Sequence, residues 1–408
     1  MAQTTQPATA PADLPRTWID PDTGHRIYRL SDEPNSGAFY FNFNAFTADG
    51  REMVYTSPKG IHVLDLQTKQ TRLVVPAPAH AIVVGKKTPS VFYTNPADNS
   101  LCVADLRTGQ IRKLADMPKR GKVATVNADE TLAAGTFIEG DGKDYGENAV
   151  KQPGLSGPNV QPVNKAQMME DRLAAKLPMT LFTIDLRTGE VKHVFEHDTN
   201  WNNHLLFSPT DPTLLMYCHE GPWQKIDRIW TIRTDGSQKT LIHKRTMAME
   251  IAGHEFWGQD GKTVWYDLQR PKGEDFILAA YNLETGLRRW YRLTRNEWSI
   301  HFNVNADASM ICGDGGDKGQ VAKAPDGKWI YLFKPELTNI TGINEKDFVQ
   351  PGNLRSEKLV NMASHNYKQE PNVHFTPGNK MVIFTATILG PSYVFGVEIE
   401  KAAPATQP

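Results

Sequence analysis

The sequence predicts an all-β fold, a seven-bladed β-propeller with a partly helical insertion in the third blade. Short apolar segments of strand length recur along the chain, and turn residues such as Gly, Asn, Asp and Pro separate them. One design of strand, turn and strand also repeats seven times. Strands between turn signals indicate antiparallel sheets, and such a repeat indicates sheets stacked around an axis. An irregular pair of β-sandwiches is the alternative.

The repeated unit is clearest in "SVFYTNPADNSLCVADLRTGQIRKLA" and "LFTIDLRTGEVKHVFE". The Thr-Gly pairs and similar Asp-Gly pairs supply the positive φ that tight hairpin turns require. The β-branched and aromatic residues beside them suit a pleated, half-buried surface. A four-stranded sheet of this kind cannot bury both of its faces alone, so the units are expected to pack against one another.

We expect residues 16–400 to form this single domain, between a disordered tether at 1–15 and a disordered tail at 401–408. Both ends are rich in Pro, Ala and Thr, which is typical of linkers. The seventh unit lacks an outer strand, and His25–Leu30 ("HRIYRL") is the segment that can supply it. Closure by this strand would protect the sheet edges.

Two longer segments interrupt the repeat. The first is an insertion at about 140–178, whose end contains helix formers after a possible N-cap at Asn164. The second is an excursion between the sixth and seventh units, at about 335–373. Long excursions from a rigid scaffold often carry function, so both are candidate walls of a cleft.

Charge and composition exclude several partners. The 45 basic and 46 acidic residues nearly cancel, which argues against nucleic acid as a partner. The longest apolar runs have strand length, so we expect no membrane insertion. Cys102, Cys218 and Cys312 fit neither a zinc motif nor a disulfide scaffold. The start resembles a mature exported chain without its signal peptide, so a periplasmic or secreted location is favoured over a cytoplasmic one. We expect a monomer or weak homodimer.

Four histidines occupy matching places in the repeat. His204, His254, His301 and His374 stand at or beside the start of consecutive units. In a propeller this position points toward the central axis, where converging imidazoles form a metal or acid-base site. For one histidine, a hydrogen bond to a neighbouring blade is the simpler explanation. For four histidines accompanied by Gln369, we favour a functional explanation.

The stretch "CHEGPWQKIDRIW" holds more polar residues than a strand needs. His219, Glu220 and Trp223 are candidates for substrate binding or for orienting Arg228. A conformational role beside the Gly-Pro pair is an equally good explanation for His219 and Glu220. Aromatic residues such as Trp223 are also more often part of a propeller core.

With "HEFWGQDG" one unit later, and "HF" and "QEPNVH" in the last two, this stretch resembles the oligogalacturonate lyase family. The resemblance runs from about Arg16 to Glu398. Members of the family are seven-bladed propellers that cleave short pectic oligomers by β-elimination. The resemblance implies that His254 is the proton-abstracting base and that Arg228 is a nearby cation.

The resemblance also implies a divalent metal ion, of the manganese type, held by three histidines and a glutamine. The matching positions are His301, Gln369 and His374. Asn372 stands where the family has its further histidine, and an amide oxygen is a weaker ligand than imidazole. His365 is another candidate for that place. Metal occupancy and substrate choice are therefore open.

The chemistry of a uronate elimination requires such a site. The proton beside a carboxylate is poorly acidic, so the enzyme must neutralise the carboxylate with a cation or an arginine fork. A neutral histidine suits the removal of that proton. The leaving oxygen needs a proton too, and the sequence does not identify its donor. Lys143 and Arg172 of the insertion are candidates for contact with further uronate carboxylates, and a solvated face explains them equally well.

Other functions remain open. The fold also suits a binding or scaffold module without enzymatic activity, and a lyase for a different uronan is a further alternative. A propeller peptidase would need a G-x-S-x-G nucleophile, which "GLSGP" around Ser156 does not supply. A glycosidase would need a carboxylate pair, and none stands out in the sequence.

Overall fold

The computed structural model describes residues 14–140, 164–320, 323–338 and 348–403. This part of the chain contains 28 strands and a single α-helix, α1 (Lys165–Ala175). Two short 3-10 helices, Trp223–Lys225 and Arg295–Glu297, complete the regular structure of the described residues. No helix among them has the length and apolar character needed to cross a membrane. The all-β prediction is confirmed.

The strands of the described residues form six hydrogen-bonded sheets, five of them with three to five strands and one with eight. The first sheet contains β3 (Glu52–Ser57), β4 (Gly60–Asp65) and β5 (Thr71–Pro76). The second contains β6 (His80–Val84), β7 (Ser90–Asn95), β8 (Ser100–Asp105) and β9 (Ile111–Asp116). The third contains β10 (Lys122–Val126), β11 (Leu132–Ile138), β12 (Met179–Asp185) and β13 (Val191–Asp198).

The fourth sheet contains β14 (Trp201–Phe207), β15 (Leu214–Glu220), β16 (Ile229–Arg233) and β17 (Thr240–Leu241). One half of the eight-stranded sheet contains β18 (Ile251–Trp257), β19 (Thr263–Gln269), β20 (Phe276–Asn282) and β21 (Arg288–Arg292). The other half contains β22 (Phe302–Val304), β23 (Ile311–Gly313), β24 (Trp329–Leu337) and β25 (Val349–Asn361). The last sheet contains β26 (His374–Phe375), β27 (Met381–Ala386), β28 (Tyr393–Lys401), β2 (His25–Arg29) and β1 (Thr17–Ile19).

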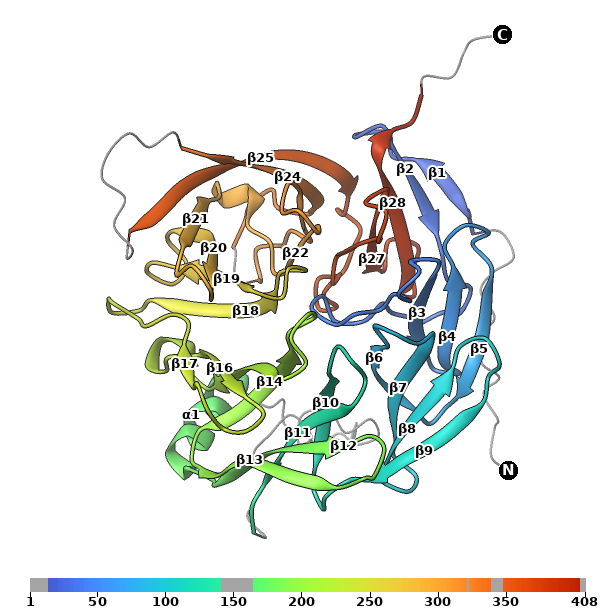
Figure 1. Ribbon diagram of the computed structural model, residues 1–408. Helices are drawn as coiled ribbons and strands as arrows, with labels where there is room; N and C mark the ends of the chain where they lie inside the picture. The colour runs from blue at the N-terminus through green and yellow to red at the C-terminus, as the bar shows by residue number, and fades with distance from the viewer. Residues whose placement is uncertain (1–13, 141–163, 321–322, 339–347, 404–408) are drawn as a thin grey trace, which may run out of the picture.

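These groups of strands lie around a common centre, as the blades of a propeller do (Figure 1). The first strand of most groups, such as β10, β14 and β18, lies nearest that centre (Figure 1). Neighbouring sheets bury their apolar faces against each other. Phe92 of the second sheet, for example, shares one buried cluster with Val126 and Phe182 of the third.

The ring is closed by the start of the chain. β2 pairs antiparallel with β28, with Ile27 opposite Val397. The prediction that His25–Leu30 supplies this strand is confirmed. Because β2 adds the N-terminal segment to a sheet that otherwise comes from the end of the chain, both ends of the domain are held by the same hydrogen-bonded ladder.

The repeated "DLRTG" turns have a common cause. The Asp105 carboxylate accepts hydrogen bonds from the backbone N–H of Arg107 and Thr108, at 2.9 and 2.7 Å. Asp185 repeats this arrangement in the next sheet. Gly109 then takes φ +71°, the left-handed region that glycine adopts without strain. An aspartate followed four residues later by glycine thus ends one strand and starts the next.

The expected insertion contains α1, between β11 and β12. The Asn164 side chain accepts hydrogen bonds from the N–H groups of Ala166 and Gln167, which confirms the predicted N-cap. The rest of the insertion, 141–163, lies outside the described residues. So do most of the expected tether at 1–15, the end of the tail at 401–408, and Ser156.

Part of the expected excursion at 335–373 is regular structure. β24 runs to Leu337, and β25 occupies Val349–Asn361. β25 pairs parallel with β21 over residues 349–353 and antiparallel with β24 over residues 352–361, so only Gly352 and Asn353 have partners on both sides. β25 is polar and contains Pro351 and Gly352, and its pairing with β24 and β21 outweighs this weak local strand propensity.

Candidate functional site

A cavity of about 720 Å³ lies where the first strands converge. Several groups of strands, helix α1 and the segment before β3 supply its walls. The two expected excursions contribute as predicted, through α1 and through the segment before β26. The lining of this cavity includes Tyr40, Phe41, Trp201, His204, Glu220, Trp223, Arg228, His254, Glu255, Gln369, Glu370 and Asn372.

His204 and His254 reach the cavity from β-bulges. Both have positive φ, 48° and 46°. The pairing of β14 with β15 is irregular between Asn203 and Leu206, and that of β18 with β19 is irregular just where His254 lies. A bulge re-aims a side chain that regular alternation would point elsewhere. The matching places that the two histidines hold in the sequence therefore correspond to matching backbone geometry, strained as functional sites often are.

His254 is oriented by a buried carboxylate. Its Nδ1 lies 2.9 Å from Asp267 Oδ1, on the adjacent strand β19. With the ring N–H directed at Asp267, Nε2 is left as a proton acceptor. Burial alone would lower the pKa of His254, but the charge and hydrogen bond of Asp267 raise it above 6.5. Trp223 meets the ring edge-on at 5.2 Å.

Arg228 lines the cavity and is not paired with Asp227, which instead binds Arg245 at 3.0 Å. The Arg228 side chain is 3% exposed. Its Nε donates to Glu255 at 2.9 Å, and its Nη1 donates to Glu220 at 2.9 Å. Although burial opposes the charged form, these carboxylates raise the pKa of Arg228 well above its ordinary value. The guanidinium is therefore already engaged by two acids.

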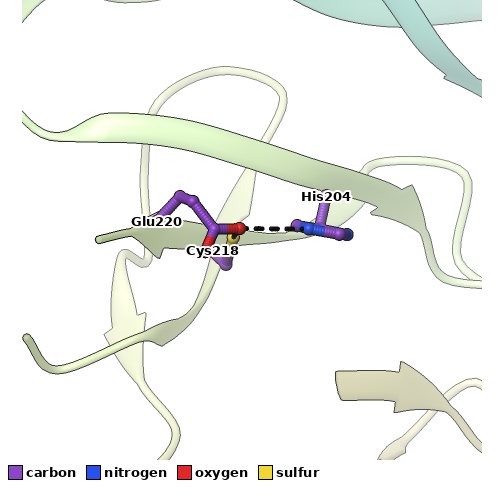
Figure 2. Close-up of side chains that lie close together, drawn as sticks. All are labelled: His204, Cys218 and Glu220. Carbon is purple, nitrogen blue, oxygen red and sulfur yellow. Dashed lines mark hydrogen bonds and ion pairs between the residues drawn. The ribbon is translucent and has the colours of Figure 1, made fainter. Parts of the chain in front are cut away.

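Glu220 connects Arg228 to His204. It accepts hydrogen bonds from Trp223 Nε1 at 3.2 Å, and its Oε2 lies 3.1 Å from His204 Nε2. Figure 2 shows the His204 ring directed at this carboxylate. Burial by itself would raise the pKa of Glu220, but Arg228 and His204 lower it well below its ordinary value.

Cys218 lies beside this pair, and ligand atoms of His204, Cys218 and Glu220 all lie within 4.8 Å of one another (Figure 2). Burial raises the pKa of the Cys218 thiol well above its ordinary value, so it stays protonated. A metal ion needs the thiolate, and Arg228 already binds the same carboxylate. This trio is therefore a poor cation site.

The predicted metal ligands His301 and His374 each direct Nδ1 at an acceptor. His301 Nδ1 lies 2.9 Å from Asp314 Oδ2, and His374 Nδ1 lies 3.0 Å from the Asn372 carbonyl oxygen. His301 Nε2 lies 3.2 Å from Tyr40 Oη. His374 Nε2 is buried and has no hydrogen-bond partner among the described residues. Burial lowers the pKa of His374 to about 4, which keeps the ring neutral.

His301 touches the first cavity through Tyr40, and its ring meets His254 at 5.0 Å between centroids. His374 lines a second cavity of about 390 Å³, which shares Phe41 with the first. Gln369 and Asn372 line the first cavity. Three of the four predicted histidines, His204, His254 and His301, thus lie at or beside the first cavity. His374 lies at the second cavity, which shares Phe41 with the first.

Three sequence interpretations need correction. Both ring nitrogens of His365 are engaged, with Thr387 Oγ1 at 3.2 Å and the Gln369 carbonyl at 2.8 Å, so His365 supports the backbone before β26. His219 does not line the cavity, because successive residues of β15 face opposite ways and Glu220 takes the inward place. It packs between Tyr217 and Trp230 instead.

The third correction concerns Arg172 of the insertion, for which contact with substrate was considered in the sequence. The guanidinium lies over the Trp201 ring, 4.3 Å from its centroid, and the residue is buried. Arg172 thus fixes helix α1 against β14. Lys143, considered for the same role, lies outside the described residues.

Sequence reasoning missed Tyr40, Glu255, Asp267, Asp314 and Glu370. The sequence contained one signal for two of these residues, Asp267 and Asp314. Asp267 follows His254 by 13 residues, and Asp314 follows His301 by the same 13 residues. This spacing carries the chain through one hairpin and back beside the histidine. Glu255 stood inside the "HEFW" motif, although the sequence gave no reason to pair it with Arg228.

Comparisons with known proteins bear on the family and the fold of this chain. Residues 14–402 match the family described as oligogalacturonate lyase. An oligogalacturonate lyase of Dickeya dadantii is 23% identical over 395 residues, which cover 92% of this chain and 93% of the relative. An oligogalacturonate lyase solved in complex with manganese has a TM-score of 0.74 and 20% identity, covering 94% of this chain and 96% of its own. A β-propeller domain from Myceliophteria thermophila has a TM-score of 0.50 and 9% identity, covering 90% of this chain and 100% of its own.

The two solved structures show that the chain has a propeller fold, and the family match extends over nearly all of its 408 residues. The chain belongs to the oligogalacturonate lyase family.

Proposed function

We propose that the protein cleaves oligogalacturonides by β-elimination, leaving an unsaturated uronate at the cut. The family supports this substrate class. One observation in the structure carries the mechanism: His254, held by Asp267, directs its free Nε2 into a central cavity beside His301. An imidazole held in one tautomer at a cavity has the geometry of a general base.

In this proposal His254 Nε2 removes the proton from the ring carbon next to the uronate carboxylate. Asp267 stabilises the imidazolium that forms, since its carboxylate faces Nδ1 at 2.9 Å. Arg228 has a changed role. With Glu220 and Glu255 bonded to it, the guanidinium orients these two acids and offsets part of their negative charge. It does not offer a free fork to the substrate carboxylate.

We propose that His301, His374 and Gln369 hold a divalent metal ion such as manganese. The donors fit, because Asp314 and the Asn372 carbonyl fix both rings with Nε2 free of its proton, and His374 Nε2 is buried without a partner among the described residues. When bound, the ion supplies Lewis-acid neutralisation of the uronate carboxylate.

At the place of the missing histidine, Asn372 Oδ1 accepts a hydrogen bond from the Phe41 N–H at 3.2 Å, which weakens it further as a ligand. The Glu370 carboxylate lies 3.7 Å from His301 Nε2 and is 44% exposed. Carboxylate oxygen is a good donor to manganese. We propose that Glu370 supplies the donor atom that this chain lacks at Asn372.

The structure contains a carboxylate pair at the cavity, Glu220 and Glu255, which a glycosidase would need. Both are bonded to Arg228, which lowers their pKa values against the effect of burial. Neither carboxyl group can therefore serve as the protonated acid that hydrolysis requires. This favours elimination over hydrolysis.

We also propose that the ring has seven blades. The two antiparallel halves of the eight-stranded sheet are joined only by the parallel pair of β21 with β25. Counted as two blades, they bring the described sheets to seven. Helix α1 then belongs to an insertion in the third blade, between β11 and β12.

The test is a continuous ultraviolet assay of the unsaturated product, with short oligogalacturonides and Mn²⁺ at several pH values. We expect wild-type activity and a loss of about 10²-fold or more in His254→Ala. His80→Ala, an exposed histidine on β6, is the matched control and should keep full activity. Equal rates in wild type and His254→Ala would refute the proposed base, and no product from any uronan would refute the lyase.

A further inference from the structure

The cluster around Arg228 holds one more acid than base. Glu220 and Glu255 both bind the guanidinium, and the side chains of all three are at most 7% exposed. Both carboxyl groups have lowered pKa values and so are ionised. Without another cation the cluster carries a net charge of −1. A buried, uncompensated charge is costly in free energy.

His204 is the group placed to balance this charge. Its Nε2 lies 3.1 Å from Glu220 Oε2, and Glu255 also interacts electrostatically with it. A proton on His204 brings the four groups to two positive and two negative charges. Its side chain is 27% exposed, much more than the other three, so His204 is the member of the cluster that is most open to the cavity.

The two bulge histidines are held in opposite ways. His254 is anchored through Nδ1, which leaves Nε2 to accept a proton. His204 is anchored through Nε2, and no described residue is hydrogen-bonded to its Nδ1. In the cationic form this Nδ1–H is a donor facing the cavity that His254 also lines. An acid and a base on neighbouring sheets are what an elimination requires.

We infer that His204 is the catalytic acid that protonates the leaving glycosidic oxygen, an assignment that rests on the proposed elimination. His254 Nε2 takes the proton from the carbon next to the carboxylate. The electron pair of that C–H bond becomes the new carbon–carbon double bond, and the bond to the leaving oxygen breaks with its electron pair. The oxygen takes the proton from His204 Nδ1. Afterwards His204 is neutral and His254 is cationic, and exchange with water restores both.

The test uses leaving groups of different acidity. His204→Asn and His254→Asn are compared, because asparagine tolerates the positive φ of both sites. Each is assayed on an oligogalacturonide and on a galacturonide with 2,4-dinitrophenolate as the leaving group at C4, which departs without protonation. Thermal unfolding of each variant and His204→Gln, which retains a hydrogen-bonding partner for Glu220, control for misfolding.

We expect His204→Asn to lose about 10²-fold to 10⁴-fold in kcat on the oligogalacturonide, and only a few-fold on the activated substrate. His254→Asn should lose activity on both, since every substrate needs the base. Equal losses of His204→Asn on both substrates, or full activity on the oligogalacturonide, would overturn the assignment while leaving the lyase intact. If wild type acts on neither substrate, the proposed function fails and the assignment with it.

Discussion

At the scale of single residues, a few contacts decide which polar groups take part in chemistry. Asp267 and Asp314 each fix the tautomer of one histidine at 2.9 Å, and Glu220 holds Nε2 of His204 at 3.1 Å. The sequence alone shows that these positions are histidines. The orientation of each ring is set by one of these carboxylates, which lie elsewhere along the chain.

The Glu370 carboxylate offers a test of the metal site that does not depend on activity. Glu370→Gln keeps the shape of the side chain but removes its charge beside His301. We expect Mn²⁺ to bind about tenfold more weakly or worse, measured by isothermal titration calorimetry. Glu284→Gln, which alters a surface pair with Lys262, is the control. Unchanged affinity in Glu370→Gln would remove this carboxylate from the metal site.

His219 gives a prediction for stability against pH. Burial lowers its pKa to about 4, whereas the unfolded chain takes up this proton near 6.5. Between these values the unfolded state binds more protons, so stability falls as the pH falls from about 6.5 toward 4. His219→Phe keeps the ring between Tyr217 and Trp230 but cannot titrate.

We therefore expect the variant to gain about 2 kcal/mol relative to wild type when the pH is changed from ~7 to ~5. Urea unfolding at both pH values measures it. His80→Phe, at an exposed histidine, should show no such difference. A parallel response of wild type and His219→Phe would mean that His219 titrates normally in the folded protein.

At the scale of secondary-structure elements, bulges and closing strands place these residues. The bulges in β14 and β18 aim His204 and His254 inward, and α1 forms part of the wall of the cavity. β2 joins the two ends of the domain through β28. If that closure stabilises the ring, loss of packing on β2 will cost stability far from the site.

Ile27 tests this closure. It is 1% exposed on β2 and packs in the cluster that contains Phe395 and Val397. Ile27→Ala should lower the free energy of unfolding by about 2–5 kcal/mol, measured by urea denaturation. Ile19→Ala on β1 is the control, since Ile19 is 46% exposed and should cost less than about 0.5 kcal/mol. Equally small losses of unfolding free energy in the two variants would show that β2 contributes little to stability.

At the scale of the whole molecule, the near balance of 45 basic and 46 acidic residues means that no global field attracts an acidic substrate. Local charge must do so. The repeat was sufficient to predict strands stacked around a centre, the closing strand and the convergence of His204, His254 and His301. It did not predict the long β25, because this polar strand forms through pairing with β24 and β21 rather than through local strand propensity.

The sequence by itself determined the pattern of strands and turns, because hydrophobic alternation and turn residues act locally. It also determined the family, through a few specific motifs. The tertiary structure alone decided that Arg228 binds Glu255, 27 residues away on the next sheet, rather than its neighbour Asp227. It likewise decided that His219 is buried while His204 faces the cavity. These choices depend on which sheets pack together and which way a bulge turns a side chain, and neither is encoded within one segment.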